Sequence, residues 1–291
     1  MNLHVTAVLV FFLAMAPAQA AVLYAISGDD SGIPRRVNQI DTDTNSVTPV
    51  FDLGDGSLGY FGLAFRNDTF YTVATDGNFD AMNLHTFTLG GGGSTAPVLG
   101  LGAGFIGGVA FRSDDLLYAI AGDPLSGESQ LYEVDLATSA VTLIDPGLGF
   151  GASGGLTWDA TAGLLYALGS DGFLGETLYA IDPDNSPGTS TPVTTLLGSG
   201  IIGGVEYVPT TGEILAIGNE LNMSELLAVT LGGGATPLGF SLSSDPRYVF
   251  SALTVGPAVD IPPGTPASVP AVPWLMLAGL SMFLRRLPRP S

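Results

Sequence analysis

The sequence predicts an all-β protein built from one repeated unit, and two observations support this prediction. The first is a strand-like run of the type Leu-Tyr-Ala-Ile, which occurs five times with its second residue at positions 24, 71, 118, 166 and 215. The steps between these copies are 47, 47, 48 and 49 residues. A fixed period of this size indicates a supersecondary unit that is repeated along the chain.

The second observation is that each unit contains four short runs with apolar residues at alternate positions. The third unit shows them at residues 107–111, 116–121, 130–135 and 140–144. Alternation at period 2 places one set of side chains on each face of a sheet. Gly, Pro, Asp and Ser bound the runs, as they do at turns between strands. Units of this length with four strands predict the blades of a β-propeller.

The first runs of these units fix the number of blades and the way the ring closes. They follow the pattern Gly-apolar-x-aromatic and begin at Gly62, Gly108, Gly155 and Gly204. The N-terminal unit lacks such a run, while the C-terminal end has a spare one at residues 251–255. Closure of the first blade by this last strand leaves no open sheet edge at the seam. We therefore predict a five-bladed β-propeller over residues 21–256, with an open solenoid of the same repeats as the alternative.

Both ends of the chain are expected to direct export. Residues 1–20 contain an apolar run too short for a typical membrane span, followed by a small-x-small cleavage site at Ala18 and Ala20. Residues 257–272 are rich in proline and small residues and are expected to form an extended linker. Residues 273–291 combine a short apolar helix with an arginine cluster, which would lie on the cytoplasmic side of a membrane.

This C-terminal segment resembles the sorting signals of the PEP-CTERM class. The matching residues are Val269, Pro270 and Pro273, the apolar stretch 274–284, and the pair Arg285 and Arg286. The Pro-Glu-Pro core of the class is absent, so the segment is similar to the variants that lack Glu. The resemblance implies sorting by an exosortase in a Gram-negative bacterium that makes exopolysaccharide. It also implies transient or retained insertion in the inner membrane and a final place at the cell surface or outside the cell.

The charge of the chain excludes some partners. Residues 29–260 contain all 27 acidic residues and only five arginines, which is a formal charge of −22, and the sequence has no lysine. Proteins that bind nucleic acid or anionic lipid through charge need Lys and Arg to replace counterions. We therefore expect no nucleic-acid partner. A cation or cationic polymer suits the charge better, although the charge also serves solubility.

One acidic residue departs from the repeat pattern and is a weak candidate for a catalytic role. The x position of the first strands holds a small residue in four units (Ala64, Ala110, Thr157 and Thr254), whereas the fifth holds Glu206. The first strand of a blade lies innermost, so Glu206 could act there as an acid, a base or a cation ligand, or simply be a satisfied acid at a blade interface. A glycoside hydrolase needs a second carboxylate, and we find no second acid on the predicted inner strands to partner Glu206.

Other kinds of catalytic site lack their residues. The chain has no Cys, and His85 is its only histidine beyond the predicted signal, at a position expected on the face of a sheet. A Ser-His-Asp triad would have to use His85, and a zinc site based on histidine lacks ligands. The glycine runs lack the Lys of a phosphate-binding loop.

Two aspartate-rich turns are candidates for calcium binding. Asp41, Asp43 and Asn45 alternate along one turn, and Asp182 and Asp184 along another, as oxygen ligands do in calcium loops. The alternative is that these side chains stabilise the turns by bonding to the local backbone. Apart from calcium, the sequence predicts no cofactor.

These observations favour a non-catalytic protein that binds a glycan or protein, or has a structural role, through loops on a rigid ring. The alternative is an extracellular polysaccharide hydrolase or lyase that uses Glu206. A purely structural matrix component with no small ligand is a third possibility, and fold alone does not decide among the three.

Overall fold

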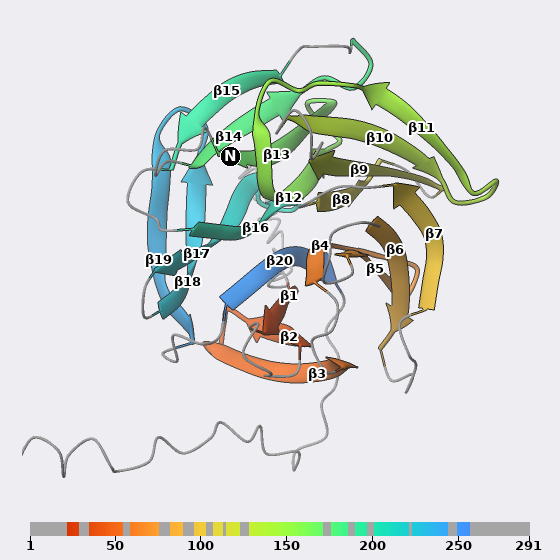
Figure 1. Ribbon diagram of the computed structural model, residues 1–291. Helices are drawn as coiled ribbons and strands as arrows, with labels where there is room; N and C mark the ends of the chain where they lie inside the picture. The colour runs from red at the N-terminus through yellow and green to blue at the C-terminus, as the bar shows by residue number, and fades with distance from the viewer. Residues whose placement is uncertain are drawn as a thin grey trace, which may run out of the picture. The chain divides into compact units, whose positions relative to one another are not determined.

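The computed structural model describes residues 22–28, 35–54, 59–75, 82–89, 96–102, 107–112, 115–122, 128–170, 176–185, 190–196, 201–220, 223–243 and 249–256. These residues form 20 β-strands in five separate four-stranded antiparallel sheets (Figure 1). The chain is therefore a five-bladed β-propeller, as the repeat predicted.

The blades are numbered here in chain order, and each is given from its inner strand outward. Blade 1 contains β20 (Val249–Gly256), β1 (Val22–Gly28), β2 (Arg35–Asp41) and β3 (Ser46–Gly54). Blade 2 contains β4 (Gly59–Arg66), β5 (Thr69–Thr75), β6 (Met82–Thr88) and β7 (Ala96–Gly102). Blade 3 contains β8 (Gly107–Phe111), β9 (Leu116–Gly122), β10 (Ser129–Asp135) and β11 (Ala140–Asp145).

The last two blades follow the same plan. Blade 4 contains β12 (Gly151–Asp159), β13 (Leu164–Ser170), β14 (Glu176–Ile181) and β15 (Ser190–Thr195). Blade 5 contains β16 (Ile201–Val208), β17 (Glu213–Glu220), β18 (Met223–Thr230) and β19 (Gly234–Ser243). Each inner strand contacts the inner strands of both neighbouring blades, which closes the ring.

The C-terminal strand completes the first blade, and this confirms the predicted closure. In Figure 1 the blue β20 lies beside the red β1, between β1 and the centre of the ring. The two strands pair antiparallel from Val22 with Gly256 to Gly28 with Val249. An open solenoid would leave β1 as an exposed inner edge. The pairing with β20 removes that edge and makes the ring depend on contact between the two ends of the domain.

The hydrophobic core is divided into five layers, one between each pair of neighbouring blades. The repeated run at the second strand supplies much of each layer. Tyr24 and Tyr118, for example, are fully buried, each in a layer with residues of the next blade. Successive side chains of a strand point to opposite faces of its sheet. Both faces of the central strands are apolar, because each face packs on a neighbouring blade.

The predicted signal (1–20), the linker (257–272) and the sorting segment (273–291) lie outside the described residues. Within the described ranges there is no α-helix, and hence no helix that could cross a membrane.

Candidate functional site

The x positions of the five inner strands lie at the centre of the ring. Four of them are buried (Ala64, Ala110, Thr157 and Thr254), and Glu206 on β16 is partly buried. The out-of-pattern acid of the sequence therefore sits on an inner strand, as predicted.

Glu206 joins three blades through its two carboxyl oxygens. The hydroxyl of Thr157 on β12 donates to Glu206 Oε2 at 3.3 Å. The backbone N–H of Val255 on β20 donates to Glu206 Oε1 at 3.2 Å. Blade 5 is thus tied to blade 4 on one side and to the closing strand of blade 1 on the other.

Thr157 also accepts a backbone N–H from the next inner strand, one blade earlier. Glu206 therefore has the same structural role as the smaller polar residue at this position. The backbone N–H of Tyr207 on β16 donates to Thr157 Oγ1 at 2.8 Å. Tyr207 follows Glu206 in the chain just as Val255 follows Thr254. In both cases a side chain at the x position accepts the N–H of the next position on the following inner strand. An unpaired buried N–H is costly, so these acceptors stabilise the ring.

Burial raises the pKa of Glu206 to about 8, and the bonds from Val255 and Thr157 only partly offset this effect. No cation is bonded to its carboxyl group in the part of the chain that the structure describes. At neutral pH the group is therefore mostly protonated. A protonated carboxyl keeps acceptor capacity on its oxygens, so the bonds from Thr157 and Val255 are compatible with the neutral form.

A second acid, Asp159, belongs to an inner strand, but it lies where β12 ends and turns into β13. It is buried, and its Oδ1 accepts the N–H groups of Thr161 at 2.8 Å and Ala162 at 3.1 Å. The expectation that the inner strands hold no second acid is therefore wrong, because β12 extends as far as Asp159. Its bonds give it the role of a turn acceptor.

The inner strands approach one another backbone to backbone at four glycines. A Cβ atom added to Gly155 would lie 2.7 Å from the backbone N of Val205 in the next blade. The same holds for Gly62 against Gly108 at 2.8 Å, for Gly108 against Gly155 at 2.7 Å, and for Gly204 against Ala252 at 2.7 Å. The sequence pattern identified these glycines as strand starts. Their physical reason is the close contact of neighbouring blades, which leaves no room for a side chain.

The first calcium candidate forms a hydrogen-bonded turn between β2 and β3. Asp41 Oδ1 accepts the backbone N–H groups of Asp43 at 2.9 Å and Thr44 at 3.1 Å. These bonds, that of Thr44 first, lower the pKa of Asp41. Asp43 and Asn45 are exposed in the same turn, and Asn45 adopts a positive φ of 53°. This arrangement satisfies the turn through its own atoms.

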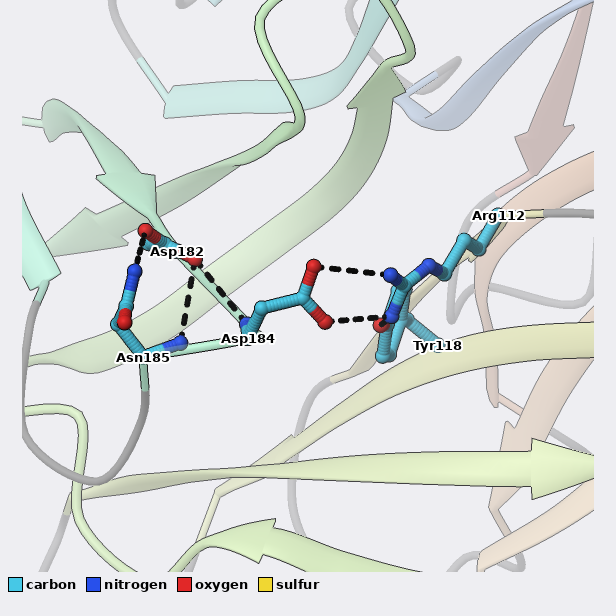
Figure 2. A network of polar contacts seen from close by, with 5 residues as sticks. All are labelled: Arg112, Tyr118, Asp182, Asp184 and Asn185. Carbon is cyan, nitrogen blue, oxygen red and sulfur yellow. Dashed lines mark hydrogen bonds and ion pairs between the residues drawn. The ribbon is translucent and has the colours of Figure 1, made fainter.

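The second calcium candidate contains the same turn and also an ion pair (Figure 2). Asp182 Oδ1 accepts the N–H groups of Asp184 at 3.0 Å and Asn185 at 3.2 Å. The carboxylate of Asp184 points away and receives both Nη groups of Arg112 at 2.8 and 2.9 Å. Asp182 and Asp184 therefore serve different partners. Among the described residues, no group of three or more His, Cys, Asp or Glu side chains is placed to hold a metal ion.

Arg112 was not identified from the sequence, although it joins blades 3 and 4. Its Nη1 also donates to the hydroxyl of Tyr118 at 2.6 Å, and its guanidinium lies 5.6 Å from the centre of the Trp158 ring. Arg66 occupies the same position in blade 2 and lies 5.5 Å from the ring of Phe111 in blade 3. The signal in the sequence was an arginine directly after the aromatic residue of the first strand in two consecutive units.

Asn219 is a second residue that sequence analysis missed, and it holds the closing strand. Its side-chain Nδ2 donates to the carbonyl of Phe250 at 2.9 Å, and its Oδ1 accepts the N–H of Phe250 at 3.2 Å. Glu206 binds the same strand near its other end. Blade 5 thus fixes β20 at two separated points.

His85 and the repeated tyrosines have structural positions. His85 is buried on the face of blade 2, with its ring edge-on to that of Tyr60 at 6.0 Å. Burial raises the pKa of Tyr24 to about 12 and also raises the pKa values of Tyr71, Tyr118 and Tyr166. These groups contribute to packing between the blades.

No protein-family model and no curated protein matches the chain. Solved structures to which it is similar include TolB from Acinetobacter baumannii, with a TM-score of 0.48 and 10% identity over 80% of this chain and 67% of that one. A puromycin hydrolase gives a TM-score of 0.39 and 18% identity, over 80% of this chain and 38% of that one. A quinonprotein alcohol dehydrogenase-like protein from Bacteroides thetaiotaomicron gives a TM-score of 0.43 and 11% identity, over 79% of this chain and 57% of that one. The assignment of the fold rests on the five sheets of the chain itself.

Proposed function

We propose that this protein is an exported β-propeller of the cell surface or extracellular matrix, with a non-catalytic binding or structural role linked to exopolysaccharide. The observation that carries the proposal is the use of Glu206. Both of its carboxyl oxygens bond to neighbouring blades, so the most conspicuous acid of the ring already has a structural task. Loops on a rigid ring then supply the binding surface.

The sorting part of the proposal rests on the C-terminal segment. Its Val-Pro-x-x-Pro run, apolar stretch and arginine cluster resemble PEP-CTERM signals. An exosortase-like enzyme is the proposed partner for this segment, during or after insertion in the inner membrane. Acidic composition supports an extracellular role, since a highly charged surface keeps a protein soluble at high concentration.

One observation favours the alternative of a polysaccharide hydrolase or lyase. A carboxyl group that is protonated at neutral pH is what a general acid requires, and the pKa of Glu206 is raised to about 8. Against this, a hydrolase of this type needs a second carboxylate at a set separation. The other inner-strand acid that the structure describes, Asp159, is bonded to two N–H groups of its turn.

The binding role is tested with a glycan array probed by the full chain and by its Glu206→Gln variant. We expect both proteins to bind the same acidic or neutral polysaccharides with similar affinity, because the loops and not Glu206 recognise them. The same polysaccharides should release no new reducing or unsaturated ends on prolonged incubation. Turnover by the wild type that the variant lacks would instead establish the enzyme.

The sorting role is tested in a Gram-negative host that has an exosortase. Replacement of Arg285 and Arg286 by Gln should shift the protein from the cell surface, as judged by protease shaving of intact cells, to another fraction. The matched control replaces Arg35 and Arg36, which lie in the ring, by Gln. Equal distribution of the wild type and the Arg285/Arg286 variant would contradict this part of the proposal.

A further inference from the structure

The outer strands of the blades share one feature that blade 3 lacks. In four blades a proline lies opposite the same position of the third strand, at Pro49, Pro97, Pro192 and Pro237. In blade 3 this position of β11 is Leu143, opposite Tyr132. A register shift lies beside the position in all five blades, so the five outer strands are equivalent there.

Proline at this position shows which way the backbone N–H would point. A proline has no N–H, and within sheets it is found on edge strands where that side faces away from the ladder. The same direction holds for Leu143 because the register is shared. Its N–H therefore points to the rim of the propeller, where the other four blades offer no donor at this position.

The residues around this donor are exposed and uncharged. All four residues from Ala140 to Leu143 are exposed, with Val141 at 36% and Leu143 at 47% of their full accessible surface. Leu238 on β19 is equally exposed at 50%, but it follows Pro237 and precedes Gly239, whose φ is 73°. That edge is interrupted, whereas β11 is regular from Ala140 to Leu143. An exposed, apolar edge without proline or charge is a site for pairing with another strand.

We propose that β11 pairs with β11 of a second copy of this chain, antiparallel and about a two-fold axis through Thr142. Val141 of one copy then lies opposite Leu143 of the other, and Thr142 lies opposite Thr142. Aliphatic side chains thus face aliphatic side chains and a hydroxyl faces a hydroxyl over the regular part of β11. Such cross-strand pairs stabilise an antiparallel ladder, and an isologous contact needs a surface that is complementary to itself.

The charge of the chain determines how this pairing should depend on salt concentration. Residues 140–144 carry no charge, whereas the chain around them is strongly acidic. Two acidic bodies repel one another, and salt screens that repulsion. Association through β11 should therefore strengthen as salt is added. A cationic partner bound to the acidic surface would show the opposite dependence.

A cysteine introduced on the proposed axis tests the pairing directly, because the chain has no cysteine of its own. Residues that face each other in an antiparallel pair have Cα atoms about 4.5–5.5 Å apart, which a disulfide can bridge. The full-length Thr142→Cys variant should form a covalent dimer under mild oxidation, visible on a non-reducing gel. Leu238→Cys, on the equally exposed edge of blade 5, is the control for random collision and should cross-link at least about tenfold more slowly.

Sedimentation velocity of the full chain over a range of concentrations supplies a second measurement without a new disulfide. We expect a monomer–dimer equilibrium that shifts toward the dimer between about 0.05 and 0.5 M salt. Thr142→Lys places like charges opposite each other on the axis and should remain a monomer, while Leu238→Lys should behave as the wild type. Equal association of Thr142→Lys and the wild type, or equal cross-linking of the two cysteine variants, would overturn the proposal.

Discussion

Glu206 at the centre of the ring and Asp41 in an outer turn are both carboxylic acids, and their surroundings shift their pKa values in opposite directions. Burial between blades raises the pKa of Glu206, while backbone N–H groups in an exposed turn lower that of Asp41. Both accept hydrogen bonds from the backbone, so the difference lies in access to water. The acid at the centre is held in its neutral form, and the acid in the turn in its charged form.

The position of an acid in the propeller therefore determines its structural role. At the centre, neighbouring blades meet backbone to backbone, and a carboxyl group serves as a hydrogen-bonding link. At the turns, a carboxylate organises a few residues of one hairpin, as Asp41, Asp135 and Asp182 each do.

The largest loss of stability is expected for Gly155→Ala, because the inner strands of neighbouring blades are in close contact at this glycine. The new Cβ would meet Val205 N at 2.7 Å, and backbone in a packed ring cannot move away easily. We expect a loss of about 3 kcal/mol in the free energy of unfolding, measured by urea denaturation. Gly212→Ala is the matched control, because its φ of 73° is close to the 77° of Gly155 but no atom lies within 4 Å of its added Cβ. The control should lose only about 1–2 kcal/mol, from backbone strain, and equal losses would contradict the account.

The raised pKa of Glu206 predicts a dependence of stability on pH that Glu206→Gln removes. The folded-state pKa lies above the unfolded value, so the contribution of Glu206 to the free energy of unfolding is fully present below about pH 4.5. It is lost as pH rises to about 8, where the folded-state group ionises. Gln can accept from Val255 and donate to Thr157 at every pH.

Thermal or urea unfolding of the wild type and Glu206→Gln from pH 4 to pH 9 checks this expectation. The two proteins should be similar in acid. The variant should be more stable by about 2 kcal/mol near pH 8–9, less than the full shift implies because the residue is only partly buried. Glu213→Gln, an exposed glutamate on β17, is the control and should follow the wild type. A constant difference between wild type and Glu206→Gln at all pH values would argue against the buried neutral acid.

The ion pair between blades 3 and 4 predicts a smaller effect. A double-mutant cycle with Arg112→Met and Asp184→Asn should give a coupling free energy of about 0.5–1 kcal/mol that falls with added salt, since both side chains are partly exposed. Arg112→Met alone should cost more than Asp184→Asn, because it also removes the bond to Tyr118 and the contact with Trp158. No measurable coupling at low salt would show that the pair contributes nothing to the interface.

The smallest effect is expected from calcium, at the two aspartate-rich turns. The acceptor oxygens of Asp41 and Asp182 already bond to backbone N–H groups, and Asp184 is paired with Arg112. We expect the midpoint of thermal unfolding to be the same in excess EDTA and in millimolar calcium. A ligand that binds only the folded state raises this midpoint, so a clear rise that Asp182→Asn abolishes would restore the calcium hypothesis.

The fold was largely predictable from the sequence, because its information is periodic. The run that contains Tyr24 recurs at each blade, and the missing first strand together with the spare strand at residues 251–255 predicted the closure through β20. Glu206 could be identified as a departure from that period. Its partners were not predicted, although Thr157 and Val255 each lie one blade period of 49 residues away, because the period does not show which side-chain and backbone atoms meet.

The contacts between blades were not predictable for the same reason. Arg112 meets Asp184 across 72 residues of sequence, and Asn219 meets Phe250 across 31. Arg112 has an equivalent in Arg66 one unit earlier, but its partner Asp184 and the pair of Asn219 with Phe250 follow no repeat. The sequence also left open whether Asp41 and Asp182 bind calcium, because a calcium ligand and a turn acceptor present the same oxygen atoms.

The most direct test of the central claim, that Glu206 is a buried neutral acid that links three blades, is an NMR titration of its carboxyl group. The chain has seven glutamates, and labelling of their side-chain carboxyl carbons gives one resonance each, with Glu206 assigned by its loss in Glu206→Gln. We expect this resonance to titrate near pH 8. Titration of this resonance close to pH 4.3, the ordinary value for a solvated glutamate, would show that Glu206 is charged at neutral pH and would contradict this claim.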